Sequence, residues 1–144
     1  MADRKEIKIP PVPTSAEAAR LIGIAHADNF RGSIRKAIKE FGFQLRIVSR
    51  AFLRKRREDD LRAAGITADP GWPLAVCEHR DDGPDVIYLV RGLPEPRVMA
   101  ALPYQLAVAL WPDGDYEQAA AYARGWLELY GKDVSVEYRS GAQV

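Results

Sequence analysis

One short segment, rich in residues that interrupt regular structure, divides the chain and limits what it can fold into. Residues 67–73 hold two prolines and a glycine, which break helices and strands. The charge changes sign close to this segment. Residues 1–65 contain 15 Lys and Arg against 8 Asp and Glu, whereas residues 66–144 contain 6 against 12. We therefore expect a basic part over residues 14–66, a linker over 67–73 and an acidic part over 74–144.

The bulk composition argues for a soluble chain that needs no cross-links. A chain of 144 residues can bury a core without disulfides, and Cys77 is the only cysteine, so no internal disulfide can form. No apolar run approaches the roughly 20 residues of a membrane span. The first eight residues lack the apolar core of a signal peptide. These features predict a cytoplasmic protein with no membrane partner.

The first 13 residues are predicted to form an extended basic arm. They hold three prolines and three basic side chains, and proline favours the polyproline II conformation. Such an arm could lie along a phosphate backbone. A disordered terminal tail is the alternative.

Two helices are predicted in the basic part. A first helix is expected to begin at Thr14 or Ser15, and Thr14 with Glu17 has the spacing of a capping box. Gly23 is expected to end it, because glycine accepts the positive φ of a helix C-terminus. After a connection over residues 24–28, apolar residues at helical spacing predict a second helix over about residues 29–41.

Basic side chains lie beside the apolar stripe of the second predicted helix. Arg31, Arg35 and Lys39 follow one another at intervals of four residues, so they would stack on one face and repel one another. Phosphates or base edges would relieve that repulsion, whereas a solvated basic face is the alternative. The predicted DNA-binding residues are Arg31, Arg35, Lys36, Lys39, Arg46, Arg50, Arg54 and Lys55.

Two interpretations stay open for residues 44–64. The alternation of apolar and polar residues over 43–48 predicts a strand. A second strand over 51–55 and a short helix over 57–64 would then make a wing. The alternative is one long basic helix over 44–64. Both interpretations leave the cations of this segment exposed.

A short sequence pattern accompanies the two predicted helices. Residues 17–24 read EAARLIGI, and Phe30-Arg31 with Ile34-Arg35 form the pattern FR..IR. In these features residues 14–64 resemble the winged helix-turn-helix of MerR and excisionase-type proteins. The connection over 25–29 is one or two residues longer than is usual there. The resemblance implies duplex DNA as partner, with the second helix facing the major groove and the wing cations contacting phosphates.

The acidic part begins with a predicted hairpin. Strands are expected over residues 74–80 and 86–91, joined at the turn signal Asp82-Gly83. Residues 92–103 contain three prolines and are predicted to be irregular.

The rest of the acidic part is predicted to be a βαβ unit. A third strand is expected over 104–111, a helix capped by Asp115 and closed by Gly131, and a fourth strand over 133–139. The crossover would be right-handed. The whole chain is therefore predicted to be α+β: a helical, winged helix-turn-helix-like part followed by a small sheet packed on one long helix.

No catalytic pattern is visible in the sequence. We find no glycine-rich phosphate loop, HExxH, CxxC or nucleophile elbow. Cys77 and His79 are two residues apart on a predicted strand and face the same side. No second Cys or His pair completes a zinc site, so a buried cysteine beside a half-exposed histidine explains them better. We expect no catalytic residue, no metal and no cofactor, and not an enzyme.

These observations predict a non-enzymatic DNA-binding protein, either a small regulator or an accessory factor. Residues 74–144 would serve as an association module, for a homodimer or a protein partner. The alternative is an adaptor or inhibitor that acts on another protein through the acidic part, with no nucleic acid bound.

Overall fold

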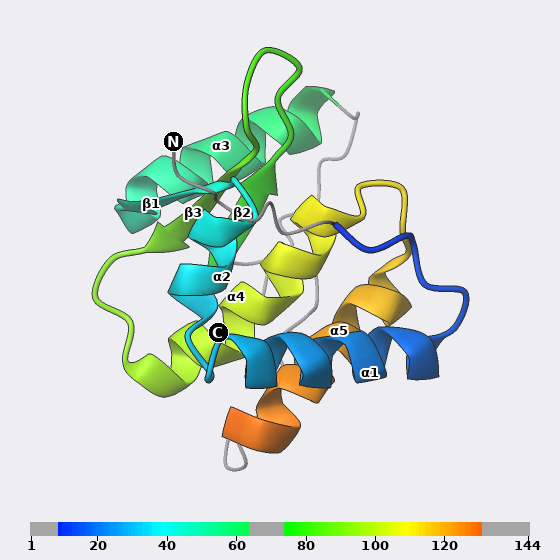
Figure 1. The fold of residues 1–144 in the computed structure, drawn as a ribbon. Coiled ribbons are helices and arrows are strands. Elements are labelled where there is room, and N and C mark those ends of the chain that lie inside the picture. The colour runs from blue at the N-terminus through cyan, green and yellow to red at the C-terminus, as the bar shows by residue number, and fades with distance from the viewer. Residues whose placement is uncertain (1–8, 64–73, 131–144) are drawn as a thin grey trace, which may run out of the picture.

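A three-stranded mixed sheet and five helices make up the part of the chain that the computed structural model describes, residues 9–63 and 74–130 (Figure 1). The sequence-predicted α+β class is confirmed. No helix in these two ranges is both long and apolar enough to cross a membrane.

The sheet joins strands from both charge halves of the sequence. Its order is β1 (Gln44–Val48), β3 (Val86–Val90) and β2 (Ala75–Glu78). β1 runs parallel to β3, and β2 runs antiparallel to it. The hairpin expected around Asp82-Gly83 is therefore confirmed. All five residues of β3 are buried, as expected of a central strand that is covered on both faces.

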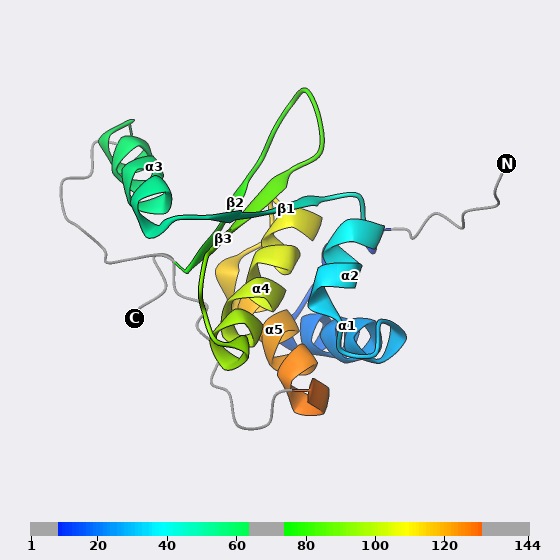
Figure 2. The ribbon, with the colours of Figure 1, turned by 90° about the vertical axis from the view of Figure 1, so that its left-hand side faces the viewer.

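Helices cover the two faces of the sheet unequally. On one face, Ile87 and Leu89 of β3 join the main core with α2 (Ile34–Glu40) and α4 (Glu95–Leu110). On the other face, Val86, Tyr88 and Val90 pack against Leu53 of α3 (Arg50–Ala63). Figure 2 shows α3 on one side of the sheet and the other four helices on the opposite side.

The close packing of α1 (Ala16–Asn29) along α5 (Tyr116–Tyr130) depends on two glycines. A Cβ on Gly23 would lie 2.1 Å from the Tyr122 carbonyl oxygen, and one on Gly125 would lie 2.2 Å from the Arg20 carbonyl oxygen. The prediction that Gly23 ends the first helix is therefore wrong. This glycine lies mid-helix because the neighbouring backbone leaves no room for a side chain.

The bounds of the first two helices differ from the prediction in other ways. The Ser15 hydroxyl caps α1 by accepting from the Ala18 amide at 3.0 Å, so of the two expected starts, Thr14 and Ser15, the second is confirmed. The helix covers the expected connection over 24–28, and the real turn lies between Asn29 and Ile34. The second helix ends before Gly42, as predicted, and this glycine has a φ of +92°.

The predicted wing is wrong. The strand expected over 43–48 is present as β1, but it pairs with β3 and not with residues 51–55, which belong to α3. The alternative of one long helix holds only from Arg50 onward. The Ser49 hydroxyl accepts from the Phe52 amide at 3.1 Å, and Leu53 is fully buried. This cap and this burial outweigh the unfavourable placement of cations in the first turns of α3.

The irregular segment predicted over 92–103 holds only for residues 92–94, and the strand predicted over 104–111 is wrong, because α4 covers residues 95–110. Pro96 lies in the first helical turn, where its missing amide is tolerated. Leu102, Leu106 and Leu110 recur every four residues and are buried, which is helical spacing. Without a strand over 104–111 the predicted βαβ unit does not form, and its other strand, over 133–139, lies outside the described residues.

The predicted helix after Asp115 is confirmed as α5. The Asp115 carboxylate accepts from the Gln118 amide at 2.8 Å, as a helix cap does. Ala119, Ala123 and Trp126 recur at helical spacing along one side of α5 and are buried. They join one main core with Phe30 and Ile38 from the basic half.

Candidate nucleic-acid interface

Positive charge is concentrated in one stretch of the chain. Residues 31–56 contain nine Lys and Arg and a single acidic residue, Glu40. They form the turn before α2, then α2, β1 and the first turns of α3, which follow one another along the β1 side of the sheet (Figure 2). We call this region the basic edge. All eight predicted DNA-binding residues lie on it and are exposed.

The cations of α2 are exposed to solvent because the opposite face of this helix is apolar and buried. Ile34, Ala37 and Ile38 are buried in the main core. Lys36 and Lys39 are therefore left on the outer face, as the sequence predicted.

Arg31 is not part of the stacked row that the sequence predicted. It lies in the turn between α1 and α2 with a φ of +51°. The expected series at intervals of four residues is thus reduced to Arg35 and Lys39, which remain one helical turn apart.

A groove between α2 and β1 brings three of the predicted cations together. It has a volume of about 390 Å³ and is lined by Arg35, Lys39 and Arg46. Its polar lining also includes Gln44, and Ile38, Phe43 and Leu45 line the rest. None of the described residues that line it is acidic. The groove therefore offers a positive surface over an apolar base.

Two of the groove cations have neighbouring partners. Arg35 Nη1 lies 3.1 Å from Glu95 Oε1, and these side chains are 50% and 60% exposed. Such an exposed ion pair contributes at most about 1 kcal/mol, so a phosphate could take the place of Glu95. Arg46 donates to the Gln44 side-chain oxygen at 3.3 Å.

The far end of β1 carries the remaining predicted cations. Arg50, Arg54 and Lys55 lie on the exposed part of α3. These cations lie at one end of β1, and the cations of α2 lie at the other end. A five-residue strand spans roughly 16 Å. Several consecutive phosphates of one DNA strand would cover that distance. Arg56, by contrast, forms an ion pair with Glu78.

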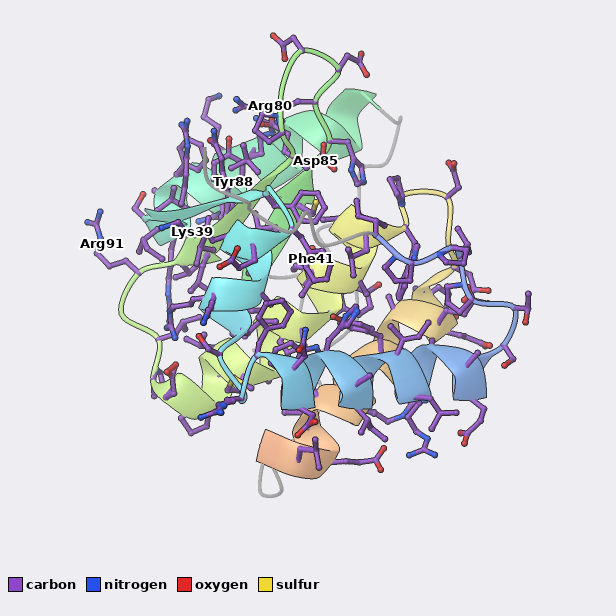
Figure 3. The ribbon with its side chains drawn as sticks, viewed as in Figure 1. Lys39, Phe41, Arg80, Asp85, Tyr88 and Arg91 are labelled. Atoms are coloured by element: carbon purple, nitrogen blue, oxygen red, sulfur yellow. The ribbon has the colours of Figure 1, made fainter. Side chains whose placement is uncertain are left out.

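Arg91 adds a cation that sequence reasoning did not include. Its backbone amide donates to the Val48 carbonyl at 2.8 Å, which places Arg91 beside the end of β1. The residue is exposed, and it lies on the same side of the molecule as Lys39 (Figure 3). Only the parallel register of β1 and β3 places it there, so no local sequence signal could have identified it.

The two histidines and the cysteine do not line the groove between α2 and β1. His26, which the sequence placed in a connection, is part of α1, and its Nδ1 lies 2.7 Å from Tyr122 Oη. Burial lowers the pKa of His26 to about 4, so this histidine is neutral at pH 7. Burial, together with the Asp85 charge, raises the pKa of the Cys77 thiol to about 12. Cys77 is therefore protonated at pH 7 and unsuited to act as a nucleophile.

Asp85 joins Cys77 and His79 in a cluster that the sequence analysis missed. His79 Nδ1 lies 2.6 Å from Asp85 Oδ2. The predicted hairpin turn could have identified Asp85 as a neighbour of His79, because a hairpin centred on Asp82 pairs residue 79 with residue 85.

Comparisons with protein-family models, with curated proteins and with solved structures found no match.

Proposed function

We propose that this protein is a non-enzymatic DNA-binding protein, a small regulator or accessory factor that contacts duplex DNA through the basic edge. The observation that carries the proposal is the groove between α2 and β1, whose lining contains Arg35, Lys39 and Arg46 and no acidic residue among the described residues. Clustered cations bind a phosphate backbone because they release its condensed counterions.

The elements of the basic edge would make different contacts with DNA. The outer face of α2 offers Lys36 and Lys39 to the major groove, in keeping with the resemblance to helix-turn-helix proteins. Arg46 and the α3 cations would contact phosphates, which position a protein on DNA without reading its sequence. In this arrangement α3 supplies the phosphate contacts that the resemblance to winged helix-turn-helix proteins assigns to a wing.

Paired substitutions on the basic edge test this proposal. The double variant Lys39→Ala/Arg46→Ala should bind a fluorescently labelled random duplex at least about tenfold more weakly by anisotropy, because it loses one cation that faces the major groove and one that contacts a phosphate. Both side chains are exposed, so stability should change by no more than about 1 kcal/mol over the two substitutions.

The matched control is Arg124→Ala, which removes an exposed cation from α5, away from the basic edge. It should bind the duplex like the wild type. Equal losses in both variants would show that the basic edge is not the interface. A wild-type protein that binds no duplex would instead favour the adaptor function.

Self-association through residues 74–144 remains a prediction alongside this function. Size-exclusion chromatography with light scattering, without DNA, would test it. A monomer at all concentrations would contradict it.

A further inference from the structure

The β2–β3 hairpin places three metal-binding side chains on one face of the sheet. Glu78 pairs with Val86 and Cys77 with Ile87, so His79 lies opposite Asp85 beyond the last paired residues. Alternate residues of a strand share a face, and directly opposed residues are nearest neighbours. One ligand atom from each of Cys77, His79 and Asp85 therefore lies within 4.8 Å of the others.

The surrounding contacts hold this cluster in place while leaving one side open to solvent. Asp85 Oδ1 accepts from the Arg80 amide at 2.9 Å, and the Asp85 carbonyl accepts from the Gln44 amide of β1 at 3.0 Å. The Asp85 side chain is 14% exposed and that of His79 is 44% exposed. Cys77 packs against the main core. Figure 3 shows Asp85 at the loop end of the hairpin.

We propose that Cys77, His79 and Asp85 form a zinc-binding site. Thiolate, imidazole and carboxylate together are ligands that zinc accepts, whereas magnesium and calcium take oxygen ligands almost alone. Three protein ligands leave the fourth position of a tetrahedral ion to water or to another ligand. This site shares no residue with the basic edge, so it stands independently of the proposed DNA binding.

Zinc binding at this cluster has a defined proton balance. The ion replaces the proton of the Cys77 thiol, and this proton passes to solvent, whereas His79 binds as a neutral imidazole that keeps one ring proton and Asp85 binds as a carboxylate. A zinc–sulfur bond, a zinc–nitrogen bond and a zinc–oxygen bond form, and no redox change is involved.

Cobalt and zinc titrations of the tag-free full chain test this proposal. One equivalent of Co²⁺ should produce the near-ultraviolet charge-transfer band of a cobalt–thiolate bond, and Zn²⁺ should remove it by displacement. Cys77→Ser should abolish the band. His79→Gln and Asp85→Asn should each weaken Zn²⁺ binding, measured by calorimetry, by at least about tenfold.

The matched control is Asp82→Asn, which changes an exposed carboxylate of the same hairpin outside the cluster. It should keep the cobalt band and the zinc affinity. A wild-type protein without the band, a band retained in Cys77→Ser, or a band lost in Asp82→Asn would each overturn the proposal. His79 is the most exposed of the three, so His79→Gln should fold even where another variant does not. Its zinc affinity therefore tests the proposal by itself.

Discussion

At the scale of single residues, two glycines decide how closely α1 and α5 approach. A methyl group on Gly23 would overlap the Tyr122 carbonyl, 2.1 Å away. Gly23→Ala should therefore lower stability by about 1–3 kcal/mol through overpacking, although alanine favours helices over glycine by about 1 kcal/mol. Urea denaturation of the two proteins measures the difference.

The control for this substitution is Gly83→Ala. No atom lies within 4 Å of a Cβ added at Gly83, so this variant should unfold close to the wild-type midpoint. A Gly23→Ala protein as stable as the wild type would show that the two helices can separate at no cost.

His26 should make stability depend on pH. Burial lowers its pKa in the folded protein to about 4, below the unfolded value of about 6.5. The unfolded chain therefore binds a proton first, and the stability that neutral His26 contributes is complete above pH 6.5 and is lost as the pH falls toward 4. Linkage gives an upper limit of about 3 kcal/mol, which solvent screening of this partly exposed side chain reduces.

Denaturation of the wild type and of His26→Gln at pH 7 and pH 5 isolates this effect. The other titrating groups are common to both proteins, so the wild type should lose more stability than the variant between the two pH values. Identical losses would mean that His26 titrates normally in the folded state.

At the scale of helices and strands, the sequence predicted elements well where a local signal coincided with burial. The alternation that predicted β1, the Asp82-Gly83 turn and the Asp115 cap are all present. The failures came where packing overrode a local signal. The glycine pattern predicts a helix end at Gly23, but this residue is a contact between helices, and the prolines predict an irregular segment up to Pro103, which lies buried inside α4.

The candidate sites show the same limit. Exposure of Arg35, Lys36 and Lys39 could be predicted because each lies off the apolar stripe of α2. The convergence of Arg35, Lys39 and Arg46 on one groove could not, since it depends on how β1 lies against α2. Arg91 and Asp85 were missed for a related reason, because strand register brings them to their neighbours.

The apolar stripe of α5 gives a prediction for a whole element. Trp126 is fully buried in the main core, so Trp126→Ala should destabilise the protein by about 3–5 kcal/mol. Leu129→Ala on the same helix is the control, because Leu129 is 43% exposed and its loss should have a much smaller effect. Thermal melts that rank the two variants the other way would place the buried face of α5 elsewhere.

At the scale of the whole molecule, the charge halves of the sequence share one core. α1 of the basic half packs along α5 of the acidic half, and β1 pairs with β3. Fragments 1–69 and 70–144 should therefore lack cooperative thermal unfolding when each is made alone, because each loses half of the shared core. A fragment 1–69 that unfolds cooperatively and binds duplex DNA would support two separate domains.

The charge split then describes two regions of one folded unit. The acidic half supplies the central strand and the helices that support α2 and β1, and the basic half supplies the cations of the basic edge. A basic edge on an otherwise near-neutral protein, with a net charge of +1, should bind DNA by local contacts with phosphates rather than by overall charge.

The salt dependence of duplex binding tests this central claim most directly. If the basic edge neutralises about five phosphates, a plot of the logarithm of the association constant against the logarithm of salt concentration should have a slope of about −4.5. Anisotropy titrations of a random duplex over a range of salt concentrations give that slope. Binding that does not change with salt, or that is absent at low salt, would contradict the account.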